Sequence, residues 1–108
     1  MWLVREGEVL AAATEARTHR ERSRGLLGRE GVTGALVLRR CRQVHTAGMR
    51  FAIDVAFCDR DGVVLRIVTL RPWRISPLVW KAAMAIEAEA GACARWGLAV
   101  GDRVEVKG

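Results

Sequence analysis

The fold prediction for this chain rests on residues 44–68, which have the sequence VHTAGMRFAIDVAFCDRDGVVLRIV. Between residues 51 and 58 large apolar side chains alternate with small or polar ones, and a period of two residues is typical of a β-strand with two different faces. The alternation resumes over residues 63–67. The tetrapeptide between the two runs, Asp59-Arg60-Asp61-Gly62, is typical of a tight turn whose glycine takes the left-handed conformation. The stretch therefore predicts a β-hairpin.

The chain is long enough to form one domain over residues 1–108 with a core of its own, and 51% of its residues are hydrophobic. It contains neither an apolar run of about 20 residues nor an N-terminal signal pattern, so we expect no membrane span and a cytoplasmic location. The three cysteines, Cys41, Cys58 and Cys93, lie far apart in sequence, which argues against a disulfide framework.

The formal net charge of +6 could support salt-sensitive contacts with nucleic acid or with acidic proteins. The arginines are scattered over the whole chain, however, as on an ordinary solvated surface. No recognition-helix, RNA-binding or zinc-finger pattern accompanies them. A basic domain that contacts nucleic acid is therefore the weakest of the functions considered.

The remaining segments predict further short elements. Thr18 and Glu21 have the spacing of a capping box, which marks the start of a helix. Residues 82–90 are ambiguous, since their Ala and Glu content favours a helix and their alternation favours a strand. The other predicted elements are an opening hairpin over residues 2–13, a helix over residues 18–27, a buried strand over residues 35–38, a short helix over residues 92–96 and a closing strand over residues 103–106. Together they predict an α+β fold, mainly β, with a small barrel-like antiparallel or mixed sheet and two short helices.

Residues 70–81 predict a loop, because Pro72 and Pro77 lack the backbone N–H that a central strand needs. Trp73, Arg74 and Trp80 lie in this loop, and two interpretations are open. The residues form an exposed recognition surface, or the indoles cap an open end of the sheet and arginine side chains lie over them.

Asp54 is a carboxylate within an otherwise apolar strand, and burial of an ionised group is costly unless it is paired or hydrogen-bonded. The His45 ring, the Thr46 hydroxyl, the Gly48 N–H and the Arg50 guanidinium are the partners that we expect. Such a network either fixes the loop before the strand or lines a pocket for a small polar ligand. The candidate ligand-binding residues are His45, Thr46, Met49, Arg50 and Asp54.

Catalytic and metal-binding interpretations fit less well. With Cys41 as nucleophile and His45 as base on one extended strand, the two side chains would stand about 13 Å apart, too far for proton transfer. A metal site would recruit Cys41, His45, Asp54 and Cys58, and also Cys93, but the chain lacks the closely spaced pairs typical of zinc sites. We therefore expect no catalytic residue, no metal and no cofactor.

Three segments carry a resemblance to a known family: RGLLGR at residues 24–29, HTAGMRFAID at residues 45–54 and GDRV at residues 101–104. With these segments the chain resembles the uncharacterised bacterial and archaeal family called domain of unknown function 192. The resemblance implies a small α+β protein with a barrel-like sheet, and a strand over residues 82–90. The resemblance does not imply an enzymatic activity. It does imply a connection with secretion or pilus assemblies. Relatives often have a W-M-x-N-T segment in place of His45 to Met49, which makes His45 a poor candidate for an obligatory base.

The function predicted first is a non-enzymatic accessory module that binds a small polar ligand, a peptide or a protein. Its surface would be formed by the five candidate ligand-binding residues near the loop from Trp73 to Trp80. The alternative is a hydrolase or isomerase of unknown substrate that uses the His45 and Asp54 region.

Overall fold

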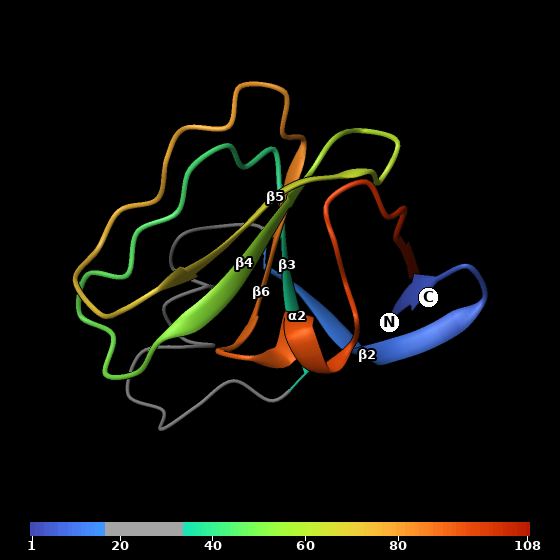
Figure 1. The fold of residues 1–108 in the computed structure, drawn as a ribbon, viewed down its shortest axis with the longest axis horizontal. Coiled ribbons are helices and arrows are strands. Elements are labelled where there is room, and N and C mark those ends of the chain that lie inside the picture. Colours follow the sequence, from blue (N-terminus) through green and yellow to red (C-terminus); the bar gives the residue numbers. More distant parts are fainter. Residues whose placement is uncertain (17–33) are drawn as a thin grey trace.

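A computed structural model describes residues 1–16 and 34–108 of the chain, which form one seven-stranded sheet and one short helix. The elements in chain order are β1 (Trp2–Arg5), β2 (Glu8–Ala16), β3 (Ala35–Arg39), β4 (Ile53–Cys58), β5 (Val64–Leu70), β6 (Met84–Glu89), α2 (Ala92–Arg95) and β7 (Glu105–Lys107). Figure 1 shows the fold as a ribbon, and the strand order across the sheet is β5-β4-β6-β3-β2-β1-β7. None of the helices formed by the described residues is long and apolar enough to span a bilayer.

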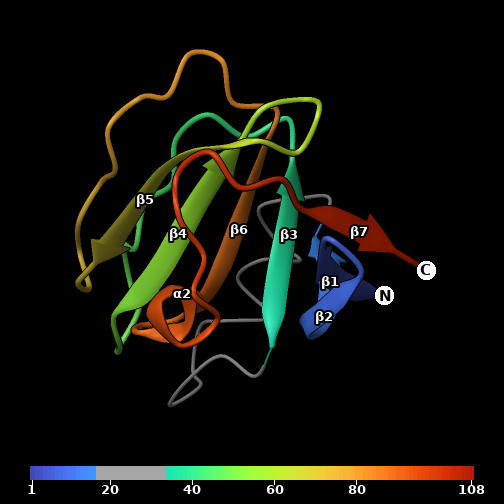
Figure 2. The same ribbon diagram turned by 45° about the vertical axis from the view of Figure 1, so that its right-hand side comes forward.

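The long strand β2 joins two groups of strands. Its first half pairs with β1 and its last four residues pair with β3. The β2–β3 pairing is parallel, whereas the other neighbours in the sheet are antiparallel. Figure 2 shows the consequence, since β1, β2 and β7 lie together at one end and β3, β6, β4 and β5 form the rest of the sheet.

The fold is mainly β, as predicted, but the barrel is not confirmed. Strands β5 and β7 are the two edges of the sheet, and an isolated bridge between Val63 and Arg103 connects the segments that precede them without closing a barrel. The second predicted helix is present as α2, whereas the predicted helix over residues 18–27 lies outside the described residues.

The predicted central hairpin is confirmed as β4, β5 and the turn between them. The Asp59 Oδ1 atom accepts hydrogen bonds from the backbone N–H groups of Asp61 and Val63, at 2.9 and 3.0 Å. Gly62 takes the left-handed conformation, with φ at 86°. The ambiguous residues 82–90 contain β6, which lies between β3 and β4 in the middle of the sheet. Because a strand pairs with this segment on each side, its alternation of side chains outweighs its helix propensity.

Strand β4 is buried on both faces. Ile53, Val55 and Phe57 belong to one apolar cluster, which the loops before β4 and before β6 cover. Ala56 and Cys58 point to the other face and belong to a second cluster, which includes residues of α2 and of the chain that follows it. Small side chains on this face leave room for α2 to lie close to the strand.

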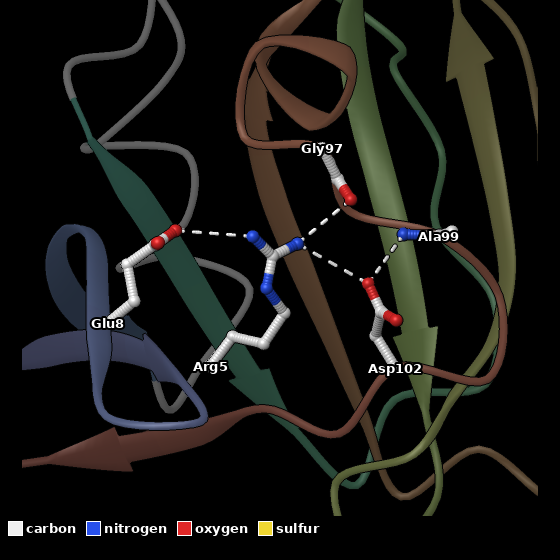
Figure 3. Close-up of polar contacts among 5 residues, drawn as sticks. All are labelled: Arg5, Glu8, Gly97, Ala99 and Asp102. Atoms are coloured by element: carbon white, nitrogen blue, oxygen red, sulfur yellow. Dashed lines mark hydrogen bonds and ion pairs between the residues drawn. The ribbon is translucent and has the colours of Figure 1, made fainter.

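Arg5 fastens the first hairpin to the chain that follows α2 (Figure 3). Its Nη1 atom donates to the carbonyl oxygen of Gly97 at 2.8 Å and lies 3.4 Å from Oδ2 of Asp102. Its Nη2 atom lies 3.2 Å from Oε1 of Glu8. The same Asp102 oxygen accepts the backbone N–H of Ala99 at 2.9 Å. The guanidinium thus holds the loop over residues 97–102 in place.

A Gly62→Ala substitution tests the contact between the central hairpin and the segment before β7. A Cβ atom at this position would collide with the carbonyl oxygen of Val104. Gly101→Ala is the matched control, because Gly101 also has a positive φ, of 96°, but has open space around the added atom. Both variants carry a left-handed strain of about 1–2 kcal/mol. The collision should cost Gly62→Ala a further loss of about 1–3 kcal/mol in the free energy of unfolding, measured by urea denaturation. Equal losses in the two variants would contradict the contact.

Candidate functional site

The Asp54 carboxylate is buried, with 3% of the residue exposed, and both of its oxygens accept hydrogen bonds. Oδ1 accepts the hydroxyl of Thr69 on the neighbouring strand at 2.7 Å. Oδ2 accepts two backbone N–H groups, from Gly91 at 3.0 Å and from Cys93 at 3.1 Å. The prediction of a buried, hydrogen-bonded acid is therefore confirmed.

The predicted donors to this carboxylate were wrong. We expected them from residues 45–50 before the strand, but they come from β5 and from the turn between β6 and α2. Asp54 lies on the face of β4 that α2 covers, and the N–H groups at the start of a helix have no partner within the helix. The carboxylate takes the place of a capping side chain there, since the residue before α2 is Gly91, which has no side chain.

Thr46 is fully buried and joins two loops. Its hydroxyl donates to the Arg71 carbonyl oxygen, at 2.6 Å, and accepts the Arg74 N–H at 2.9 Å. Its backbone N–H donates to the Arg74 carbonyl oxygen at 2.8 Å. The loop over residues 40–52 and the loop over residues 71–83 consequently run side by side (Figure 1). These bonds give Thr46 a structural role rather than a place in an open pocket.

The other three predicted site residues lie in different surroundings. Met49 is buried and packs in the cluster of Ile53, on the face of β4 opposite to Asp54. His45 is half-buried, pairs through its backbone with Ile75, and its Nδ1 atom lies 3.4 Å from the backbone N of Ala47. Arg50 is exposed. The structure therefore brings only His45 and Arg50 to the surface, while Asp54 lies beneath α2.

The tryptophan loop, defined here as residues 73–80, carries a dense group of exposed apolar side chains. Trp73 and Trp80 are 70% and 71% exposed, and Ile75 and Leu78 are 66% and 42% exposed. Arg74 is exposed between them. Because both indoles face solvent, the arrangement favours the recognition surface over the interpretation in which the indoles cap the sheet.

The β4–β5 turn, the end of β3 and the start of β6 lie at the same end of the inner strands (Figure 1). A groove of about 740 Å³ lies between these segments. Its lining residues are Arg40, Arg42, Asp59, Arg60, Asp61, Trp80, Lys81, Ala82 and Ala83. The sequence reasoning missed the three arginines as a group. The cue available in the sequence was that Arg40 and Arg42 follow one buried strand, β3, and that the Asp59 turn follows another, β4. Both strands pair antiparallel with β6, which lies between them, so their ends reach the same edge of the sheet.

Glu87 was also missed, although it is fully buried in the middle of β6. It lies opposite Leu36 on one neighbouring strand and Val55 on the other. Assignment of residues 82–90 to an inner strand would have been the signal, because both faces of such a strand are covered and a carboxylate there must be buried.

Cys58 and Cys93 are small buried residues, as predicted. Burial, followed by the nearby Asp59 carboxylate and Cys93, raises the pKa of the Cys58 thiol to about 12. Burial, followed by the charge of Asp54 and a hydrogen bond to it, raises the pKa of the Cys93 thiol to about 12. Cys41 is half-exposed, and its Sγ donates to the Gln43 carbonyl oxygen at 3.3 Å. Within residues 1–16 and 34–108, no group of three or more His, Cys, Asp or Glu side chains is placed to hold a metal ion.

Comparisons with known proteins give a family and a fold. The model of the family DUF192, described as "Uncharacterized ACR", matches residues 2–106. A crystal structure of a protein of unknown function from Novosphingobium aromaticivorans is 22% identical, with a TM-score of 0.73, and the match covers 87% of this chain and 74% of that chain. A Sinorhizobium meliloti protein described as a "putative transcription regulator" is 23% identical, with a TM-score of 0.71, and the match covers 86% of this chain and 79% of that chain. None of the curated proteins matches the chain. At these identities the two solved structures indicate a shared fold alone.

Replacement of Asp54 with Ala should lower the free energy of unfolding by about 3–5 kcal/mol, because one hydroxyl and two N–H groups would lose a buried charged acceptor. Urea denaturation followed by circular dichroism measures the loss. Thr69→Val is the graded control: it removes one of the three hydrogen bonds to the carboxylate and should cost about 1.5–3 kcal/mol. If Asp54→Ala were no more damaging than this control, the carboxylate would not hold α2.

Iodoacetamide at mildly alkaline pH should alkylate Cys41 in the folded protein and leave Cys58 and Cys93 unmodified. The thiolate is the reactive form, and a pKa of about 12 keeps both buried thiols protonated. In urea all three thiols should react, and mass spectrometry of the peptides released by cleavage before aspartate distinguishes them, because each cysteine then lies in a separate peptide. Equal alkylation rates at Cys41 and Cys93 in the folded state would contradict the burial of Cys93.

Proposed function

This chain belongs to the uncharacterised family DUF192, and we propose that it is a non-enzymatic binding module whose tryptophan loop recognises an acidic segment of a partner protein. The exposure of Trp73, Ile75, Leu78 and Trp80 within eight residues carries this proposal. Contiguous exposed apolar side chains mark interaction sites, and Trp and Arg are the residue types that contribute most to protein interfaces.

Hydrogen bonds to the neighbouring loop over residues 40–52 hold the tryptophan loop in place, which favours binding. Besides the bonds of Thr46, the Ser76 Oγ accepts the Val44 N–H at 2.9 Å, and the Ser76 N–H donates to the Val44 carbonyl oxygen at 2.8 Å. Pro72 and Pro77 restrict the backbone on either side of Ser76. Because the backbone is already ordered, binding of a partner costs little further conformational entropy.

The charge of the surface argues for an acidic partner. Arg71, Arg74 and Lys81 are exposed in or beside the loop, and no ion pair joins any of them to another residue of the described chain. The whole chain carries a net charge of +6. A second copy of the chain would bring like charges together, so it is disfavoured as the occupant.

The other predicted functions have less support. A catalytic role for the His45 and Asp54 region would need a carboxylate that is available to substrate, and both oxygens of Asp54 serve the fold. A small polar ligand at His45 and Arg50, a connection with secretion or pilus assemblies and a cytoplasmic location stay predictions.

Two labelled peptides test the proposal by fluorescence anisotropy. Both contain the same Leu and Phe residues, and they differ in having Glu or Lys at the remaining positions. The Glu peptide should bind and the Lys peptide should not. The double variant Trp73→Ala/Ile75→Ser should bind the Glu peptide at least about tenfold more weakly, since a large apolar contact is worth more than 1.4 kcal/mol.

The matched control is Trp2→Ala/Val9→Ser, which removes exposed apolar side chains from the first hairpin and should leave the affinity unchanged. Equal binding of the two peptides, or an equal loss in the control, would overturn the proposal. Concentration-dependent self-association that Trp73→Ala/Ile75→Ser abolishes would assign the loop to a second copy, and would also overturn it.

A further inference from the structure

The basic groove beside the tryptophan loop has a chemistry of its own. We propose that it binds a nucleotide, with the di- or triphosphate held by Arg40, Arg42, Arg60 and Lys81 and the base stacked on Trp80. Trp80 and Lys81 border both surfaces, but the three arginines of the groove lie outside the tryptophan loop and take no part in the peptide-binding proposal. The inference therefore stands independently of the peptide-binding proposal.

The charges in the groove favour a multivalent anion. Four cations face two carboxylates, and the Asp59 carboxylate is already occupied, through Oδ1, by two N–H groups of the turn. Within residues 1–16 and 34–108, no ion pair involves any of the four cations. Like charges gathered in one groove raise the local potential, and a polyphosphate relieves their repulsion while it accepts charge-assisted hydrogen bonds.

The size of the groove and its aromatic wall favour a nucleotide over inorganic phosphate. A volume of about 740 Å³ lies within the range of sites for small organic ligands. The exposed Trp80 indole offers a flat apolar surface, on which nucleic acid bases stack in other proteins.

The groove is preformed, because backbone hydrogen bonds connect the three segments that line it. The Arg40 N–H donates to the Ala83 carbonyl oxygen at 2.7 Å, and the Ala83 N–H donates to the Cys58 carbonyl oxygen at 2.8 Å. The Val79 N–H donates to the Arg42 carbonyl oxygen at 2.8 Å. A ligand that enters therefore does not have to order the walls.

Isothermal titration calorimetry with ATP, pyrophosphate and adenosine tests the inference. ATP should bind more tightly than either of the other two compounds, and its affinity should fall as salt is added. Arg42→Gln/Arg60→Gln should weaken ATP binding at least about tenfold, because two charge-assisted contacts are lost. Trp80→Leu should weaken the binding of ATP but not of pyrophosphate.

The controls remove matched side chains outside the groove. Arg66→Gln/Arg74→Gln deletes two exposed positive charges, and Trp73→Leu removes an equally exposed indole. Both should retain ATP binding, and circular dichroism checks that every variant is folded. The inference is overturned if ATP fails to bind at millimolar concentration, if pyrophosphate binds as tightly as ATP, or if the control arginine variant loses as much affinity. It is also overturned if a single-stranded oligonucleotide binds more tightly than ATP, because the groove would then belong to a nucleic-acid surface.

Discussion

The buried carboxylate of Asp54 connects β4, in the middle of the sheet, to the segment that follows β6 and contains α2. An ionised group inside an apolar sheet persists only where donors surround it, and here one hydroxyl and two backbone N–H groups do so. The short helix α2 has little stability by itself. The position of α2 over the face of β4 that carries Ala56 and Cys58 therefore depends on this acceptor. It also depends on the small size of these two side chains, which leaves room for the helix.

The sequence was informative wherever a pattern is local. Alternation between residues 51 and 58 and the turn ending at Gly62 identified the central hairpin, and the isolated acid in an apolar run identified a buried polar group. The two backbone donors to that acid could not be predicted, because Gly91 and Cys93 reach it only through the pairing of β6 with β4. Nothing local to residues 82–90 specifies that they enter the sheet between two other strands, and open and closed sheets share the same local alternation.

The same distinction applies to the candidate surfaces. Trp73 and Trp80 could be identified as candidate surface residues, because two prolines exclude their segment from the interior of the sheet. Thr46 and Met49 were predicted as ligand-binding residues because they lie in the segment that was expected to surround Asp54. The neighbouring loop covers Thr46, however, and the cluster of Ile53 encloses Met49. Arg40, Arg42 and Arg60 come from two separate segments, and strand order alone brings these segments to one groove.

The pairing of β1 with β7 has a consequence for folding kinetics. Trp2 lies opposite Lys107, so this pair joins residues that are 105 positions apart in the sequence (107 − 2). Loop closure is entropically costly, and contacts between residues distant in sequence slow the search for the native state. The β4–β5 hairpin needs only a tight turn, whereas β7 has three residues and one neighbouring strand. We therefore expect the hairpin to form early, and β7 to dock last and to open first in native-state hydrogen exchange.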